Sequence, residues 1–217
     1  MRGFISAGLL LLAFAGIAAA ALGGHLQGFD RAFLLALRTG DAHDPIGPHW
    51  VEIMFLDLTS LGSYTIVTVI TFAVTGFLLF DGRRGTALLV LAAVGGGTLL
   101  NNLLKYMFDR PRPDLVAHAV DVQTTSFPSG HAMLAATVYL TLGVLLARTQ
   151  HRRSVRIYIL ALAAAITVLV GVSRVYLGVH WPTDVMAGWC AGAAWAAICW
   201  EIARRLQQRG DVEKPAG

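Results

Sequence analysis

The run TALLVLAAVGGGTLLNNLLK, residues 86–105, decides the class of fold. Its first nineteen residues carry no charged side chain, and Lys105 follows directly after them. An α-helix needs about 20 mostly apolar residues to cross the hydrocarbon core of a bilayer. The run therefore predicts a transmembrane helix. The three consecutive glycines at 95–97 predict that a neighbouring helix approaches it closely.

Five further apolar runs occur along the chain, at residues 4–22, 64–80, 133–147, 157–172 and 185–200. The last three are short by strict count and reach the length of a span when their polar-flanked ends are included. We therefore predict an all-α, polytopic membrane protein with six transmembrane helices. Residues 1–217 form one domain in this interpretation, and residues 204–217 form a polar cytoplasmic tail. Residues 50–61 mix apolar and acidic side chains, and either lie in the membrane interface or extend the second span.

The composition agrees with a membrane protein and excludes several other classes. Apolar residues make up 56% of the chain and charged residues only 14%, against about 25% charged in soluble domains. A soluble or disordered chain needs more charge, and two cysteines do not make a disulfide scaffold. The formal charge is +4, but the basic residues fall in short clusters between apolar runs. We therefore expect no nucleic-acid partner.

The basic residues also predict an orientation, because Lys and Arg concentrate in cytoplasmic loops. With the N-terminus inside, eleven of the 17 Lys and Arg residues fall in cytoplasmic segments and six in outer segments. Both termini are then cytoplasmic. The first run has an alternative interpretation as a cleaved signal peptide, since it follows Met1-Arg2 and contains small residues at 18–21. Cleavage would leave the rest of the topology unchanged.

Polar residues gather in three segments that this topology places on the outer side: 105–114, 126–131 and 173–184. These segments contain three cations: Lys105 and Arg112 after the run at 86–104, and Arg174 after the run at 157–172. Cations at membrane depth are costly and usually mark a functional site. Each alone is compatible with anchoring to lipid headgroups, whereas three beside histidines favour an anionic ligand such as phosphate. We expect Asp109 and Asp114 to pair with Arg110 or one of its neighbours.

Two further patterns bear on catalysis. Ser129 is suited to cap the helix of the fourth span, whose first turn then offers the free N–H groups of Gly130 and His131 to an anion. His180 and Asp184 lie four residues apart, so one helical turn can bring the carboxylate to the imidazole. Each pattern also has a purely structural interpretation, as a helix cap or as an acidic residue that complements a helix dipole.

Together the three segments resemble the signature of the type 2 phosphatidic acid phosphatases, which share their site with vanadium haloperoxidases. The matching residues are Lys105 and Arg112-Pro113, then Pro128-Ser129-Gly130-His131, then Ser173-Arg174, His180 and Asp184. The close resemblance covers residues 105–184. It implies that His180 is the nucleophile, that Asp184 orients it, and that His131 is the general acid and base. By the same resemblance, the phosphoryl oxygens are held by Lys105, Arg112, Ser129, Gly130 and Arg174.

The resemblance implies a lipid phosphatase of the bacterial inner membrane with a phosphohistidine intermediate, and the distribution of basic residues predicts that its site faces outward. A lipid phosphate or pyrophosphate is the expected substrate, with undecaprenyl pyrophosphate or phosphatidylglycerol phosphate favoured. No metal or other cofactor is expected, since no cluster of ligands has metal-binding spacing. Three alternatives stay open: a haloperoxidase, although the known ones are soluble, a lipid-linked phosphotransferase, and a non-catalytic transporter or scaffold.

Overall fold

The computed structural model describes residues 2–40, 44–116 and 124–210. The described residues form helices joined by loops: α1 (Arg2–Leu22), α2 (Gln27–Leu35), α3 (His49–Ser60), α4 (Tyr64–Phe80), α5 (Arg84–Met107), α6 (Gly130–Arg148), α7 (Arg153–Tyr176) and α8 (Pro182–Arg209). The prediction of an all-α protein is confirmed.

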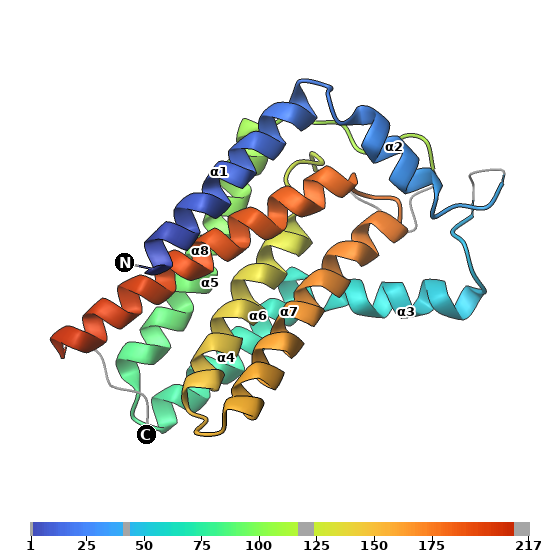
Figure 1. The fold of residues 1–217 in the computed structure, drawn as a ribbon. Helices are drawn as coiled ribbons and strands as arrows, with labels where there is room; N and C mark the ends of the chain where they lie inside the picture. The colour runs from blue at the N-terminus through green and yellow to red at the C-terminus, as the bar shows by residue number, and fades with distance from the viewer. Residues whose placement is uncertain (1, 41–43, 117–123, 211–217) are drawn as a thin grey trace.

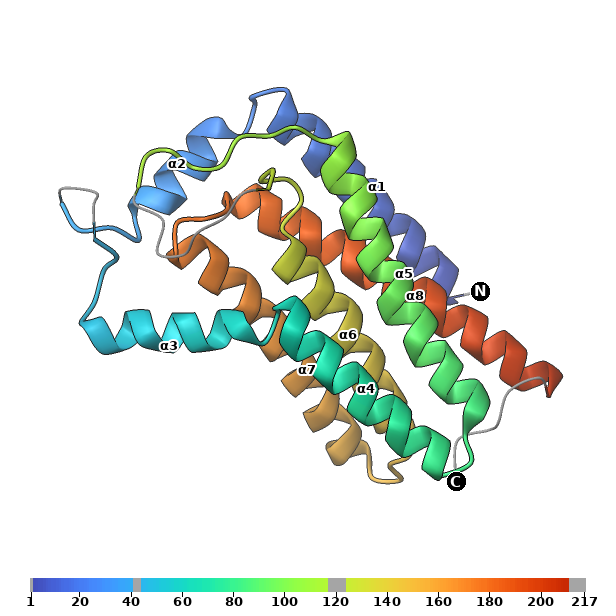
Figure 2. The same ribbon diagram turned by 180° about the vertical axis from the view of Figure 1, so that it is seen from behind.

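The long helices form a bundle around α6 (Figures 1 and 2), which contacts α5, α7 and α8. The bundle buries 61% of the most apolar stretch of α6, against 17% for α1, which packs on α8 at the edge. The N-terminus of α6 is therefore held at the centre of one end of the bundle. This end carries the residues that the sequence singled out.

Five of the described helices, α1, α5, α6, α7 and α8, are long and apolar enough to cross a membrane on their own. Helices α3 and α4 meet the same criterion only together, and the chain bends by 48° between them. The chain turns at Gly62, where an added Cβ would lie 3.0 Å from the backbone oxygen of His131. The predicted polytopic plan is confirmed, and α3 is a separate helix before the α4 span.

Small residues allow the helices around α6 to approach closely. An added Cβ at Gly96 or Gly97 of α5 would overlap Trp195 or Thr137 on neighbouring helices, as the glycine run predicts. On α8, a Cβ at Gly188 would lie 2.6 Å from the backbone oxygen of Ser129. Because glycine has no Cβ at this position, α8 can lie directly against the start of α6.

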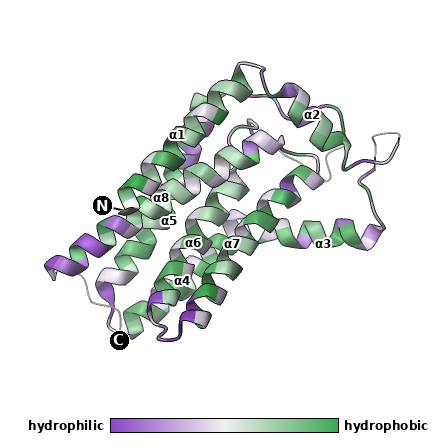
Figure 3. Ribbon diagram, viewed as in Figure 1, coloured by the Kyte–Doolittle hydropathy of each residue, from purple (hydrophilic) through white to green (hydrophobic). Residues whose placement is uncertain are grey.

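Hydrophilic residues gather at both ends of the bundle, and apolar ones cover its length (Figure 3). The start of α1, the end of α8 and the α4–α5 and α6–α7 loops lie at one end (Figure 1). Helix α8 continues to Arg209, so residues 204–209 of the predicted tail are helical, whereas residues 211–217 lie outside the described part of the chain.

Candidate active site

The three polar segments converge at the opposite end of the bundle. Lys105 lies in the last turn of α5, His131 in the first turn of α6, and His180 between α7 and α8. His131 interacts electrostatically with Arg174, His180, Lys105 and Arg112. The fold therefore brings together residues that are up to 79 positions apart in the sequence, from Lys105 to Asp184.

His180 lies between a carboxylate and a guanidinium. Its Nδ1 is 3.5 Å from Oδ2 of Asp184, and its Nε2 is 3.3 Å from a terminal nitrogen of Arg112. A guanidinium only donates hydrogen bonds and a carboxylate only accepts them. The surroundings therefore favour the tautomer with the proton on Nδ1 and an unprotonated Nε2, whose lone pair faces the Arg112 donor.

Burial sets the charge of this imidazole. Only 2% of His180 is exposed. Burial lowers the pKa of His180 to about 3, because it outweighs the opposing effect of Asp184 and is reinforced by Arg174 and Arg112. The side chain is consequently neutral near pH 7, as a nucleophile must be.

Asp184 is fixed by donors on both of its oxygens. It occupies the third position of α8, and its Oδ2 accepts a hydrogen bond of 2.9 Å from the backbone N–H of Trp181, which precedes the helix. The hydroxyl of Ser126 also donates to Oδ2, and Arg110 donates to Oδ1. The carboxylate therefore caps its own helix while it faces His180.

Two of the three predicted cations are held by backbone carbonyls. Lys105 Nζ donates to the carbonyl of Thr125 at 2.7 Å. Arg112 donates from Nε to the carbonyl of Thr124 at 2.8 Å and from a terminal nitrogen to that of Val179 at 2.6 Å. Burial lowers the pKa of Arg112, but a guanidinium stays charged in proteins. Both cations are thus fixed in position without a neutralising carboxylate in these contacts.

Arg174, the third cation, is buried in the last turn of α7. Its terminal nitrogen donates to the hydroxyl of Thr59 at 2.8 Å. Thr59 belongs to α3, so the angled helix that precedes the α4 span supports this cation. That contact could not be predicted from the sequence, because it joins residues 115 positions apart.

The start of α6 has the features of an anion site. Ser129 is the N-cap residue, and its backbone N–H donates to the backbone oxygen of Asp184 at 3.0 Å. Its buried hydroxyl has no hydrogen-bond partner within the described residues. At Gly130, an added Cβ would lie 3.2 Å from Asn101 and 3.4 Å from Cε of Lys105. Glycine therefore lets the N-terminus of the helix approach the lysine, where an anion is favoured.

A sequence model of the PAP2 superfamily matches residues 86–208. The chain belongs to this superfamily. It is 36% identical over 148 residues to phosphatidylglycerophosphatase B of Bacillus subtilis, covering 66% of this chain and 70% of that protein. It is 32% identical over 142 residues to the undecaprenyl-diphosphatase of Sulfolobus acidocaldarius, covering 63% of each chain.

A solved PAP2 structure has the same fold. The crystal structure of a transmembrane PAP2-type phosphatidylglycerolphosphate phosphatase from Bacillus subtilis superposes with a TM-score of 0.76 at 29% identity. The match covers 95% of this chain and 98% of that one. The likeness therefore extends over the whole bundle, α1 and the α3–α4 pair included.

The expected partner of Arg110 is wrong. Arg110 contacts Asp30 and Asp184, not Asp109 or Asp114. The segment after α5 is not helical, and in an extended chain successive side chains point to opposite sides. Arg110 is buried, and its neighbour Asp109 is consequently exposed; Asp114 is exposed as well. Sequence proximity gave no indication of the true partners.

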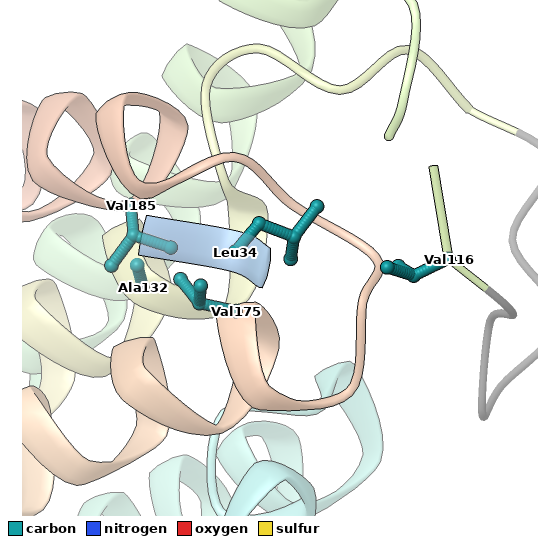
Figure 4. Close-up of a cluster of buried hydrophobic side chains, with 5 residues drawn as sticks. All are labelled: Leu34, Val116, Ala132, Val175 and Val185. Atoms are coloured by element: carbon teal, nitrogen blue, oxygen red, sulfur yellow. The ribbon is translucent and has the colours of Figure 1, made fainter. Parts of the chain in front are cut away.

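An apolar cluster supports the site from within the bundle (Figure 4). Its buried members are Leu34, Val116, Ala132, Val175 and Val185. Three of them directly follow the site residues His131, Arg174 and Asp184 in the sequence. Leu34 comes from α2 and is fully buried. Helix α2, which lies between the apolar runs at 4–22 and 64–80, therefore packs on the elements that carry the site.

Proposed function

We propose that this PAP2 protein is a membrane phosphatase that hydrolyses a lipid phosphate or pyrophosphate through a phosphohistidine at His180. The observation that carries the proposal is the environment of His180. Its Nε2 faces Arg112 at 3.3 Å and its Nδ1 faces Asp184 at 3.5 Å. A neutral, oriented imidazole beside a fixed cation can attack phosphorus while the cation stabilises the phosphoryl oxygens.

In this mechanism, Nε2 of His180 forms the bond to phosphorus as the bond to the leaving oxygen breaks. His131 protonates that oxygen and then takes a proton from the water that hydrolyses the phosphohistidine. The oxygens of the phosphoryl group are held by Lys105, Arg112, Arg174, the Ser129 hydroxyl and the Gly130 N–H. Positioning and charge supply most of the rate in such reactions.

We propose that the reaction needs no metal ion. Within the described residues, no group of three or more His, Cys, Asp or Glu has the geometry of a metal site. Three side-chain cations instead supply the positive charge that a metal would bring to a phosphate.

For the substrate, we favour undecaprenyl pyrophosphate or phosphatidylglycerol phosphate. The relatives in Bacillus subtilis and Sulfolobus acidocaldarius are named for activity on lipids of these two kinds. Lys105 and Arg174 lie at the ends of the α5 and α7 spans, so a lipid headgroup meets the site at the membrane surface. We propose that this surface is the outer one and that both termini are cytoplasmic, because the basic residues favour that orientation.

The test is phosphate release by the purified protein from a panel of lipid phosphates and pyrophosphates. We expect turnover that survives EDTA, and a loss of at least about 1,000-fold in His180→Ala. The matched control is His25→Ala, since His25 is an exposed histidine in the turn between α1 and α2. An inactive wild type, wild-type turnover in His180→Ala, or transfer of labelled phosphate to a second lipid instead of water would contradict the proposal.

A further inference from the structure

A buried ionic network lies next to the His180–Asp184 pair. One terminal nitrogen of Arg110 is 2.7 Å from Oδ2 of Asp30, and the other contacts Oδ1 of Asp184. Both aspartates are fully buried and Arg110 is 8% exposed. Charges that are removed from water in this way are stable only when they are well paired. One guanidinium therefore serves two carboxylates, one of which belongs to the candidate catalytic pair.

Thr183 completes the network at the start of α8. Its hydroxyl accepts a hydrogen bond from Arg110 at 2.8 Å and donates one to Oδ2 of Asp30 at 2.7 Å. Its backbone N–H donates to Oδ1 of Asp30 at 3.0 Å. The first N–H groups of a helix have no partner within it. Asp30 of α2 therefore supplies an acceptor to the helix that carries Asp184.

The network contacts the Asp184 carboxylate on the oxygen that does not face His180. Arg110 engages Oδ1, which leaves Oδ2 to face the imidazole. Without that contact, Oδ1 loses its Arg110 donor, and the carboxylate is held only at Oδ2, by the Ser126 hydroxyl and the Trp181 N–H. We propose that Arg110 is a positioning residue that fixes Asp184 for His180, and that Asp30 holds Arg110 in place. This inference rests on the proposed function of the site.

Asp30 anchors the network to the bundle through helix α2. Asp30 lies one helical turn before Leu34 on α2, and Leu34 inserts into the apolar cluster beneath the site (Figure 4). The same short helix is thus attached to the site by a polar contact and by an apolar one. The guanidinium of Arg110 also lies 5.7 Å from the ring centre of Trp181. These contacts restrain Arg110 from two sides.

The test is a double-mutant cycle with Arg110→Gln and Asp184→Asn in the folded, detergent-solubilised enzyme. We expect Arg110→Gln to lower kcat at least about tenfold and to change KM by less than about threefold, because it acts on the chemical step. In the Asp184→Asn background, the same change should lower kcat by less than about threefold, since the group it positions is already lost. If Arg110 had a purely structural role, its effect on kcat and that of Asp184→Asn would add in the double variant.

Two further variants keep the test decisive. Asp109→Asn is the matched control, because Asp109 is the exposed neighbour of Arg110, and it should retain wild-type kcat. If Arg110→Gln fails to fold, Asp30→Asn keeps the Arg110–Asp184 contact and should show a smaller loss of kcat that is again absent with Asp184→Asn. Unchanged kcat in the folded variants, or additive losses, would overturn the positioning role.

A spectroscopic measurement separates this inference from the proposed function. The side-chain nitrogen signals of His180 report its tautomer whether or not the protein turns over a substrate. We expect the Nδ1–H tautomer in the wild type and in Asp109→Asn, and a mixture of tautomers in Arg110→Gln. An inactive wild type would contradict the proposed function but would not bear on the positioning role of Arg110. An identical His180 tautomer in all three proteins would contradict that positioning role.

Discussion

The charge state of His180 follows from what surrounds it. Burial and two neighbouring cations lower its pKa to about 3, although Asp184 acts in the opposite direction. Between pH 6.5 and 3 the unfolded chain therefore binds a proton at this position and the folded protein does not. It follows that His180 contributes stability that is present above about pH 6.5 and is lost as the pH falls toward 3.

We predict that His180 is still neutral at pH 5. An imidazole with the ordinary pKa of about 6.5 is almost fully protonated at that pH. Nitrogen NMR of histidine-labelled protein should show a neutral imidazole that is absent from the spectrum of His180→Gln. A protonated His180 at pH 5 would show that burial does not control its charge.

At the residue scale, the sequence predicts which polar residues come together but not the contacts that support them. Lys105, Arg112, His131 and His180 converge as the spacing of their segments indicates. The contact between Arg110 and Asp30 joins residues 80 positions apart. It depends on how α2 packs, and packing between distant elements has no local signal in a sequence.

At the scale of elements, glycines set how closely α6 and α8 can approach. An added Cβ at Gly192 of α8 would overlap the backbone oxygen of Met133 on α6. Backbone atoms cannot move aside as a flexible side chain can, so the helices would have to separate. Van der Waals packing is one of the forces that hold helices together within a membrane, beside interhelical hydrogen bonds and lipid entropy.

We therefore predict that Gly192→Ala destabilises the protein by about 1–3 kcal/mol. Gly95→Ala is the matched control, because nothing lies within 4 Å of an added Cβ there, and an alanine favours a helix by up to about 1 kcal/mol. Thermal melting in detergent should show a lower Tm for Gly192→Ala only. Equal Tm values for the two variants would contradict the close contact.

The sequence predicts the long helices well and the short ones poorly. Helices α7 and α8 extend beyond their apolar runs, and at the end of α8 the polar residue Glu201 pairs with Arg204 and Arg205. Helix α2 has only nine residues, and its buried positions are Asp30 and Leu34. One buried acid and one leucine give too weak an apolar pattern to predict a helix.

At the scale of the molecule, the site and the main basic clusters lie at opposite ends of the bundle. Basic residues such as Arg83, Arg148 and Arg204 occupy the end where α8 finishes, and Arg148 donates to Gln207 of α8 at 2.7 Å. Figure 3 shows the corresponding hydrophilic ends. If that end is cytoplasmic, the site faces the opposite surface of the membrane.

Single cysteines test this orientation in a Cys190→Ala, Cys199→Ala background, since both native cysteines are free. Asp114→Cys lies at the site end and His151→Cys at the other, and both positions are exposed. We predict that an impermeant maleimide labels Asp114→Cys in intact spheroplasts and labels His151→Cys only after lysis. The reverse pattern would invert the topology and place the site inside.

The covalent intermediate is the most direct test of the central claim. Protein mixed with a lipid substrate labelled at the phosphate should be quenched within one turnover and digested. We predict a label that is stable to alkali, labile to acid and located on His180, and that is absent in His180→Ala but retained in His25→Ala. A label on another residue, or normal turnover in His180→Ala, would contradict His180 as the nucleophile.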